Sequence, residues 1–271
     1  MTDTNTYIQQ LKAFNPLRES LIREAIRILQ LPAGSKGLDA GCGIGLQTFL
    51  LAEEVGPFGH VTGLDISAEF LQYAEGLVER TGVAKRTSFK EGNVHSLPFA
   101  NDTFDWVWSV DCAGYPVTEK PALLLQELAR VVKPGGYVAL LGYSSQQLLP
   151  GHPLLEARLN ATCLSHAPLL EGKKPEQNFL CAPGWFRESG FGDIAVHTLV
   201  KDIFVPLGED IRMALLSLLD MLWGKKSSEV SEGDWEEFQR LCRPESPDFI
   251  LNRSNYYAFY TYSMFSGKVP C

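Results

Sequence analysis

The sequence lacks the histidine and carboxylate spacings that metal sites use. Its five histidines form neither an H-x-H nor an H-E-x-x-H pattern, and no carboxylate cluster has the spacing of metal ligands. The histidines are His60, His95, His152, His166 and His197. We therefore expect no metal in the functional site.

Paired cysteines are missing as well. The six cysteines are scattered without a C-x-x-C pair, and no export signal places them in an oxidising compartment. They are Cys42, Cys112, Cys163, Cys181, Cys242 and Cys271. We expect them to be reduced thiols.

Neither a basic stripe nor a long apolar run is present. Lysine and arginine number 24 against 32 aspartates and glutamates, and the net charge of −8 opposes binding to a phosphate backbone. No apolar run has the length of a membrane span. We expect a cytoplasmic protein that binds no nucleic acid and inserts into no membrane. No pattern in the sequence indicates an oligomeric state.

What the sequence does have is an alternation of strand-like and helix-like segments. The expected strands end at Asp39 or lie near residues 60–66, 87–93, 104–110, 136–143, 191–199 and 256–267. The expected crossover helices cover residues 46–55, 67–79 and 121–132. This order predicts an α/β fold: a doubly wound, Rossmann-like, mostly parallel seven-stranded sheet with helices on both faces.

Other segments mark helix ends or interrupt the alternation of strands and helices. Asn15-Pro16 predicts the start of a helix, and K-P-G-G at 133–136 predicts the turn that ends the helix before it. Residues 144–182 and about 208–242 are expected to be insertions. The second insertion should hold two helices, one over 211–223 and one that begins after Ser231.

A glycine-rich loop follows the first strand. LDAGCGIG, residues 38–45, carries three glycines, which let backbone N–H groups come close to a nucleotide-like ligand. The spacing is G-x-G-x-G, with Leu46 where a dinucleotide fingerprint has its last glycine, which disfavours NAD. A plain strand-to-helix turn is the alternative interpretation.

An acid ends the second strand. Asp65 lies twenty residues beyond Gly45, where a carboxylate can accept hydrogen bonds from the two hydroxyls of a ribose. The pair therefore predicts an adenosine-containing ligand. The alternative is an aspartate that stabilises the start of the helix at Ser67.

Five motifs together resemble a known family. LDAGCGIG, GLDIS, EGNVHSLPF, FDWVWSV and ELARVVKPGG have the order and spacing of class I S-adenosylmethionine-dependent methyltransferases. The chain is similar to the subgroup typified by ubiquinone and menaquinone biosynthesis methyltransferases. The resemblance covers roughly residues 36 to 143 and extends weakly through 185 to 200.

The resemblance implies a cofactor, S-adenosyl-L-methionine, and residues that bind it. Gly41 and Gly43 would face its methionine and ribose part, and Asp39 would steady the loop and the amino group. Asp65 would hold the ribose hydroxyls, and Ile66 would pack on the adenine.

Further cofactor contacts are expected from three other segments. The family often has an acid where this chain has Asn93, followed by Val94, and the Asn93 carbonyl oxygen can still accept a hydrogen bond from the adenine amino group. Val110 would lie over the cofactor, as its counterpart does in the family. Tyr7 would place an aromatic face on the sulfonium cation if the N-terminus closes the site.

The implied activity is transfer of a methyl group from S-adenosylmethionine to a small, partly apolar acceptor by direct displacement. An acceptor hydroxyl or protonated amine also needs a base. Asp111, Tyr115 and Tyr143 follow strand ends at the edge where α/β sheets bind ligands, so they are the candidate catalytic residues. Packing or loop capping is the alternative role for each.

The expected domain organisation depends on the sheet edge at which the cofactor should bind. Residues 1–35 would cover the cofactor site, 36–143 would bind the cofactor, 144–182 would form a cap, and 183–271 would complete the sheet with the helical insertion. Two other functions remain open: a non-catalytic S-adenosylmethionine-binding sensor or scaffold, and an NAD-dependent oxidoreductase. The oxidoreductase would want a G-x-G-x-x-G loop and commonly has a Tyr-x-x-x-Lys pair, which this chain lacks.

Overall fold

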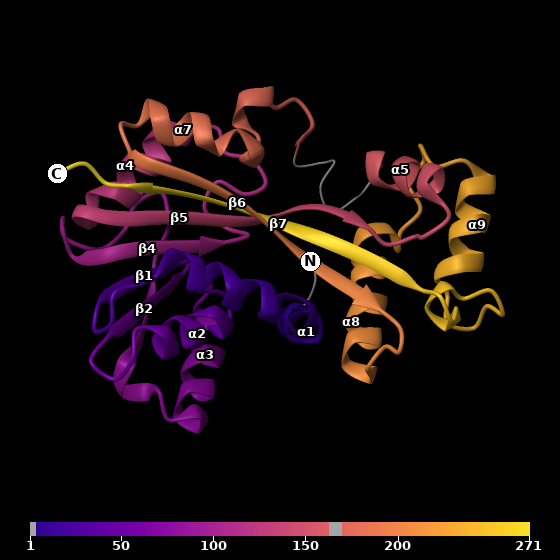
Figure 1. The fold of residues 1–271 in the computed structure, drawn as a ribbon, viewed down its shortest axis with the longest axis horizontal. Coiled ribbons are helices and arrows are strands. Elements are labelled where there is room, and N and C mark those ends of the chain that lie inside the picture. The colour runs from indigo at the N-terminus through magenta and orange to yellow at the C-terminus, as the bar shows by residue number, and fades with distance from the viewer. Residues whose placement is uncertain (1–3, 163–169) are drawn as a thin grey trace. The chain divides into compact units, whose positions relative to one another are not determined.

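The computed structural model describes residues 4–162 and 170–271. Within them the strands form a seven-stranded sheet in the order β3-β2-β1-β4-β5-β7-β6 (Figure 1). The pairs β3–β2, β2–β1, β1–β4 and β4–β5 are all parallel, so the predicted α/β fold is confirmed. The strands are β1 (Lys36–Ala40), β2 (His60–Asp65), β3 (Thr87–Glu91), β4 (Phe104–Val110), β5 (Val132–Gln147), β6 (Gly192–Phe204) and β7 (Tyr257–Lys268).

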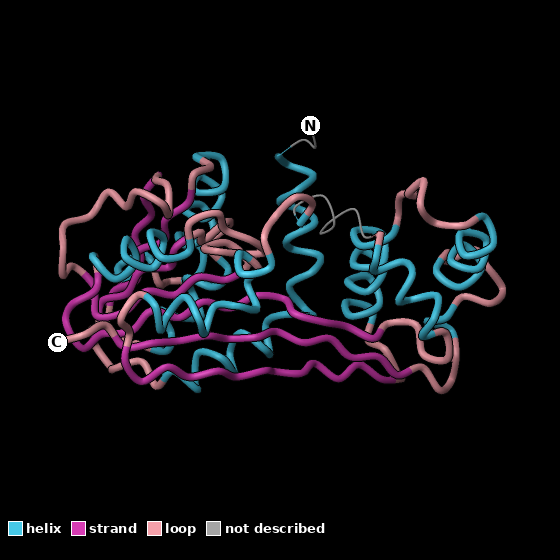
Figure 2. Tube along the Cα trace, turned by 90° about the horizontal axis from the view of Figure 1, so that it is seen from above, coloured by secondary structure: helices cyan, strands magenta, loops and turns pink. Residues whose placement is uncertain are grey.

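Helices connect most of these strands, as Figure 2 shows with helices in cyan and strands in magenta. The predicted helices correspond to α2, α3, α4, α8 and α9, and Ser231 caps α9 by accepting a hydrogen bond from the Asp234 N–H. The described helices are α1 (Thr4–Leu29), α2 (Leu46–Glu54), α3 (Ala68–Thr81), α4 (Pro121–Arg130), α5 (Pro153–Ala161), α7 (Ala182–Glu188), α8 (Glu209–Trp223) and α9 (Glu232–Cys242). Short 3-10 turns cover Ala84–Arg86, Pro175–Gln177, Phe179–Cys181 and Ile250–Asn252.

The chain divides into two compact units. The first unit contains the described parts of residues 1–21, 144–172 and 200–261, and the second contains residues 22–143, 173–199 and 262–271. The chain passes from one unit to the other within α1, β5, β6 and β7, and also between Gly172 and Lys173. Every predicted site residue from Asp39 to Tyr143 belongs to the second unit.

One face of the sheet in the second unit packs against α4 and α7. Alternate residues of a strand point to the same face, and Leu38 and Ala40 of β1 are buried there together with Val107 of β4. The helices contribute apolar side chains to the same cluster: Leu124, Leu125 and Leu128 from α4, and Trp185 and Phe186 from α7.

The other face brings strands and α2 close together. A Cβ atom on Gly37 would lie 2.0 Å from the ring of Trp106, so the indole needs a glycine beside it. The Trp106 ring donates a hydrogen bond from Nε1 to Ser35 Oγ over 2.8 Å. Asp39 points to the same face, where it meets Thr48 of α2.

Helix α4 ends before the K-P-G-G segment, as predicted, but this segment forms no separate turn. Residues 133–136 belong to β5, whose register to β4 shifts between Phe104 and Trp106, so they form a bulge within the strand. Gly135 takes a positive φ of 80°, and its N–H donates to the Val269 carbonyl. Helix α4 therefore ends at Arg130, and strand β5 begins two residues later, at Val132.

The predicted start of the first helix is also wrong. α1 begins at Thr4 and contains Pro16, and Asn15 donates a side-chain hydrogen bond to Glu19 over 3.2 Å instead of capping a helix. Proline removes one backbone hydrogen bond inside a helix. Burial of Ile8, about two turns before the proline, favours the longer helix.

No described helix has both the length and the apolar character that crossing a bilayer requires.

Candidate active site

The glycine loop between β1 and α2 turns back over the end of β2. Gly41, Gly43 and Gly45 have φ angles of 82°, 53° and 79°, which side-chain-bearing residues rarely adopt. The N–H groups of Gly41 and Cys42 donate to the Leu64 carbonyl over 2.7 and 2.9 Å. The loop is therefore anchored to the second strand by its backbone.

The first two glycines have different surroundings. A Cβ atom on Gly41 would lie 2.1 Å from the sulfur of Cys112, so this glycine allows the loop after β4 to pack against it. A Cβ atom on Gly43 would meet nothing within 4 Å. Burial, reinforced by the charges of Asp65 and Asp39, raises the pKa of Cys112 to about 12, so its thiol is a packing group at neutral pH.

Asp65 ties this loop to the next helix. Its Oδ2 accepts a hydrogen bond from the Gly43 N–H over 2.8 Å, and its Oδ1 accepts one from the Ser67 N–H over 2.9 Å. Ser67 in turn caps α3 by accepting from the Phe70 N–H. The helix-start contact that the alternative interpretation required is thus present. Each carboxylate oxygen has a further lone pair for a ligand.

Asp39 is the buried acid of the site. Its Oδ2 accepts a hydrogen bond from the Thr48 hydroxyl over 2.7 Å. Burial raises the pKa of Asp39 to about 7; the hydrogen bond from Thr48 opposes this rise and the charge of Asp65 adds to it. The group therefore titrates near neutral pH, where a nearby cation would ionise it.

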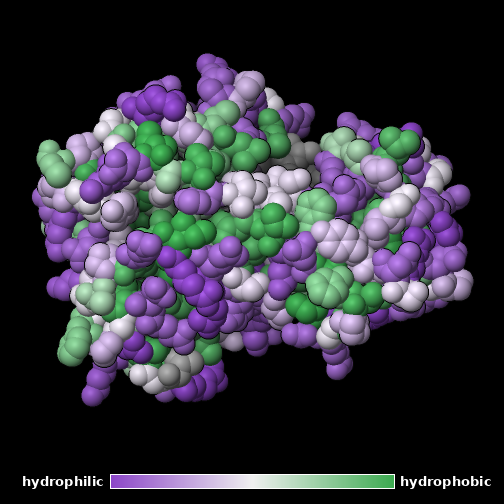
Figure 3. Space-filling model, in the orientation of Figure 1, coloured by the Kyte–Doolittle hydropathy of each residue, from purple (hydrophilic) through white to green (hydrophobic). Residues whose placement is uncertain are grey.

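Ile66 directly follows Asp65 and is 69% exposed. Hydrophobic residues reach the surface elsewhere too, as Figure 3 shows in green among the purple hydrophilic ones. Exposure alone is therefore not a sign of function. Because it lies beside the Asp65 carboxylate, the Ile66 side chain could pack against the flat face of a ligand ring.

Asn93 and Val94 lie in the turn after β3. The Asn93 Oδ1 atom accepts a hydrogen bond from the His95 N–H over 2.9 Å, so its carbonyl oxygen already has one donor. Its second lone pair can take another. Val94 is half-buried and packs against the apolar cluster beneath α4.

The end of β4 is fixed by a buried serine. Ser109 donates from Oγ to the Ala40 carbonyl over 2.7 Å and accepts from the Ala113 N–H over 2.9 Å. Val110 follows it and is 8% exposed. The serine therefore holds the loop after β4 against the end of β1, next to the glycine loop.

The Asp111 carboxylate joins three strands. Its Oδ1 accepts from the Tyr143 N–H of β5 over 3.0 Å, and its Oδ2 accepts from the Tyr262 hydroxyl of β7 over 2.8 Å. Its own N–H donates to the Leu141 carbonyl, and its φ of 49° is positive. This half-buried acid is held in one orientation at the carboxyl edge of the sheet.

The candidate tyrosines differ in their contacts. Tyr143 places its ring edge-on to Tyr262, with centroids 6.0 Å apart, beside Asp111. Tyr115 packs edge-on against the buried ring of Phe179 at 5.4 Å. Tyr7 lies on α1 in the first unit and is 46% exposed, so its contact with the cofactor stays a prediction.

Comparison with known proteins agrees with this arrangement. The family model of the methyltransferase domain matches residues 31–190, more than half of the chain. The chain belongs to the methyltransferase domain family. The resemblance inferred from the five motifs is thereby confirmed.

Relatives and solved structures extend the comparison. A demethylmenaquinone methyltransferase of Bacillus cytotoxicus is 37% identical over 129 residues, which cover 47% of this chain and 52% of that protein. The chain thus spans about half the length of the curated relatives it matches. A phosphoethanolamine N-methyltransferase 2 of Haemonchus contortus in complex with S-adenosyl-L-methionine has 18% identity and a TM-score of 0.59, covering 99% of this chain and 58% of that one.

A second solved structure shares the fold over both chains' full length. The S-adenosylmethionine-dependent methyltransferase of Aquifex aeolicus has a TM-score of 0.51 and 18% identity, and the match covers 97% of this chain and 99% of that one. These structural likenesses show that the methyltransferase domain has the expected Rossmann-like fold.

Four residues of the candidate site have contacts that the sequence did not predict. Thr48 binds Asp39, Ser109 joins β4 to β1, Cys112 fills the space beside Gly41, and Tyr262 binds Asp111. Ser109 lies within the FDWVWSV motif, whereas Thr48, Cys112 and Tyr262 lie outside the five motifs. Tyr262 lies 151 residues from its partner, a distance at which only a known sheet order could have paired them.

The described residues do not gather metal-ligating side chains in one place. No cluster of three or more histidine, cysteine, aspartate or glutamate side chains could hold a metal ion in residues 4–162 and 170–271. Two of the scattered candidates, Cys163 and His166, lie outside these ranges.

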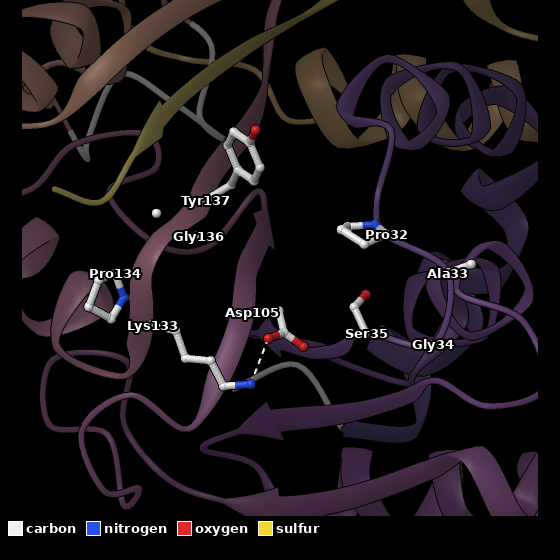
Figure 4. A pocket seen from close by; sticks show the side chains of 10 residues that line it. Pro32, Ala33, Gly34, Ser35, Asp105, Lys133, Pro134, Gly136 and Tyr137 are labelled. Carbon is white, nitrogen blue, oxygen red and sulfur yellow. Dashed lines mark hydrogen bonds and ion pairs between the residues drawn. The ribbon is translucent and has the colours of Figure 1, made fainter. Parts of the chain in front are cut away.

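A pocket of about 380 Å³ opens at the other edge of the sheet, where the parallel strands begin (Figure 4). It lies between residues 32–35 and 133–137, and Asp105 forms an ion pair with Lys133 over 2.7 Å at its wall. The charged groups that face this pocket therefore already have partners in each other.

Proposed function

We propose that this chain transfers a methyl group from S-adenosylmethionine to a small, partly apolar acceptor. The observation that carries the proposal is the Asp65 carboxylate, which binds both the glycine loop and the start of α3 at the carboxyl edge of the sheet. An acid in this place presents oxygens to the two hydroxyls of a ribose. Membership of the methyltransferase domain family supports the same assignment.

The residues present fit this cofactor. The open space at Gly43 leaves room for a ligand against the loop, and Ile66 offers an exposed apolar surface. We assign the ribose hydroxyls to Asp65, the adenine to Ile66 and its neighbours Asn93 and Val94, and the amino group to the region of Asp39. Gly41 and Val110 complete the assigned cofactor residues, and Tyr7 remains a further candidate. When bound, S-adenosylmethionine supplies an electrophilic methyl group.

Asp111 is the proposed base. Its two oxygens accept hydrogen bonds from the Tyr143 N–H and the Tyr262 hydroxyl, which hold the carboxylate at the carboxyl edge of the sheet. An acceptor hydroxyl or ammonium that approaches the carboxyl edge can give its proton to an Asp111 oxygen. Tyr143 is the weaker candidate, and the packing of Tyr115 on Phe179 favours a structural role for that ring.

The acceptor and the surrounding parts of the chain belong to the same proposal. We assign residues 144–182 and 208–242 to an acceptor cap and residues 1–35 to a cover of the cofactor. Most residues of the cap lie in the first unit, which has a core of its own built on α8 and α9. A demethylated quinone, named in the relatives' activity, is one acceptor to test. A cytoplasmic location also stays a prediction.

The test is incubation with methyl-labelled S-adenosylmethionine and a panel of small acceptors that includes demethylated quinones, phenols, amines and thiols. Label should move to at least one acceptor. Binding of the cofactor without transfer to any acceptor would favour the sensor or scaffold, and absence of binding would contradict the assignment altogether.

A further inference from the structure

The loop after β3, residues 92–101, carries Asn93 and Val94, the two residues assigned to the adenine. We call it the β3 loop. Its first residue, Gly92, is fixed by a hydrogen bond from its N–H to the Asp65 carbonyl over 2.9 Å. What fixes the rest of the loop is a pair of charged side chains on α4.

Arg130 is the central member of that pair. A guanidinium has five N–H donors, and every one of them has an acceptor in the structure. Three acceptors belong to the β3 loop: the Leu97 carbonyl at 3.0 Å, the Phe99 carbonyl at 2.8 Å and the Asn101 Oδ1 atom at 3.0 Å. The other two are the carboxylate oxygens of Glu127, at 2.9 and 2.8 Å.

Glu127 binds the same loop directly. Its Oε1 atom accepts a hydrogen bond from the Leu97 N–H over 2.6 Å. Glu127 thus binds the N–H of Leu97, and Arg130 binds the carbonyl of the same residue. Leu97 is 5% exposed and lies in the core. Leu97 is therefore fixed by polar contacts on one side and by burial on the other.

Asn93 lies between two anchored residues, Gly92 and Leu97. The backbone between them forms a tight turn in which the Ser96 N–H donates to the Asn93 carbonyl over 3.0 Å and the His95 N–H donates to Asn93 Oδ1 over 2.9 Å. Asn93 is exposed. Its orientation depends on the turn and on the anchored end at Leu97.

We propose that Arg130 is a positioning residue, which holds the β3 loop in the shape that recognises the adenine base of the cofactor. The proposal rests on the proposed function, because it assumes that Asn93 and Val94 face that base. Arginine is required because a lysine ammonium is a single point charge with three donors and cannot bind Leu97, Phe99, Asn101 and Glu127 together.

The experiment compares two ligands that differ only at the base. Titration calorimetry measures the dissociation constants of S-adenosylhomocysteine and of S-inosylhomocysteine, in which a carbonyl replaces the adenine amino group. The wild-type chain should bind S-adenosylhomocysteine more tightly. Arg130→Lys should weaken that binding on the order of tenfold and should bring the ratio of the two constants toward one.

Two control variants separate positioning from general stability. Lys133→Gln removes a more exposed cation, which pairs with Asp105 at the amino edge of the sheet, and it should change neither constant. Asn101→Ala removes one acceptor of Arg130 and should shift the ratio in the same direction by less. It also carries the test if thermal unfolding shows that Arg130→Lys does not fold.

The outcomes are distinguishable. Equal weakening of both ligands in Arg130→Lys, or an unchanged ratio in a folded variant, would overturn the role of Arg130 while the cofactor assignment stands. A wild-type chain that binds neither ligand would contradict the proposed function itself.

Discussion

The two edges of the sheet in the second unit both carry aspartates, but in opposite electrostatic settings. At the carboxyl edge, Asp39 and Asp65 accept hydrogen bonds from Thr48 and from backbone N–H groups, and neither forms an ion pair within the described residues. At the amino edge, Asp105 binds Lys133 over 2.7 Å (Figure 4). It also accepts a hydrogen bond from the Lys36 N–H over 2.7 Å.

The pKa values follow this difference. Burial alone would raise the pKa of Asp105, but the hydrogen bonds and charges of Lys133 and Lys36 outweigh it and hold the pKa below its usual value. For Asp39, burial prevails and the pKa rises to about 7. The amino edge is satisfied within the protein, whereas the carboxyl edge retains capacity for a cationic or hydrogen-bonding ligand.

The largest expected effect separates two glycines with similar backbone angles. Gly41→Ala should abolish measurable binding of S-adenosylhomocysteine, because its Cβ would lie 2.1 Å from the Cys112 sulfur and its φ is 82°. Gly135→Ala, at the amino edge with a φ of 80°, meets no atom closer than the Cys271 sulfur at 3.7 Å. It should cost only about 1–2 kcal/mol of stability and keep normal affinity. Calorimetry and urea unfolding of both variants check this, and full binding by Gly41→Ala would contradict it.

The next effect concerns the acids near the reaction. Asp111→Asn keeps a hydrogen-bond acceptor but loses the base, so the methylation rate of a hydroxyl or amine acceptor should fall by roughly 10²–10⁴. The affinity for the cofactor should change little. Asp105→Asn is the matched control at the amino edge and should leave the rate unaltered. A rate that is equal in both variants would remove Asp111 from the mechanism.

The two edges should also respond to pH with opposite sign. The folded-state pKa of Asp39 lies above its usual 3.8, so this acid favours the ligand-free fold at low pH, and that contribution is lost as the pH rises from about 4 to 7. The slope should be at most about 1.4 kcal/mol per pH unit. Asp105, with a lowered pKa, contributes stability above its usual pKa that is lost on acidification.

Urea unfolding of the ligand-free wild-type chain, Asp39→Asn and Asp105→Asn between pH 3 and 8 measures these slopes. The difference between wild type and Asp39→Asn should decrease toward pH 7 and then stay constant. A difference that is independent of pH would show that the pKa of Asp39 is the same in the folded and the unfolded chain, which would contradict the raised value.

Much of this site could be predicted from local sequence. The strand before Asp39, the glycine loop and the acid at the end of the second strand depend on hydrophobic alternation and backbone freedom, which are visible within a few residues. The K-P-G-G bulge could not be predicted in this way, because its strand pairing depends on Val269 at the far end of the chain. The same holds for Tyr262, whose bond to Asp111 exists only once β7 has joined the sheet.

The central claim is that the carboxyl edge, through Asp65, binds S-adenosylmethionine and its demethylated product. Calorimetric titration of S-adenosylhomocysteine into wild type, Asp65→Ala and Asp105→Ala tests it directly. Asp65→Ala removes both acceptors for the ribose hydroxyls and should weaken binding by about 2–3 kcal/mol, while Asp105→Ala should bind as the wild type does. Unchanged affinity in a folded Asp65→Ala variant would contradict the account.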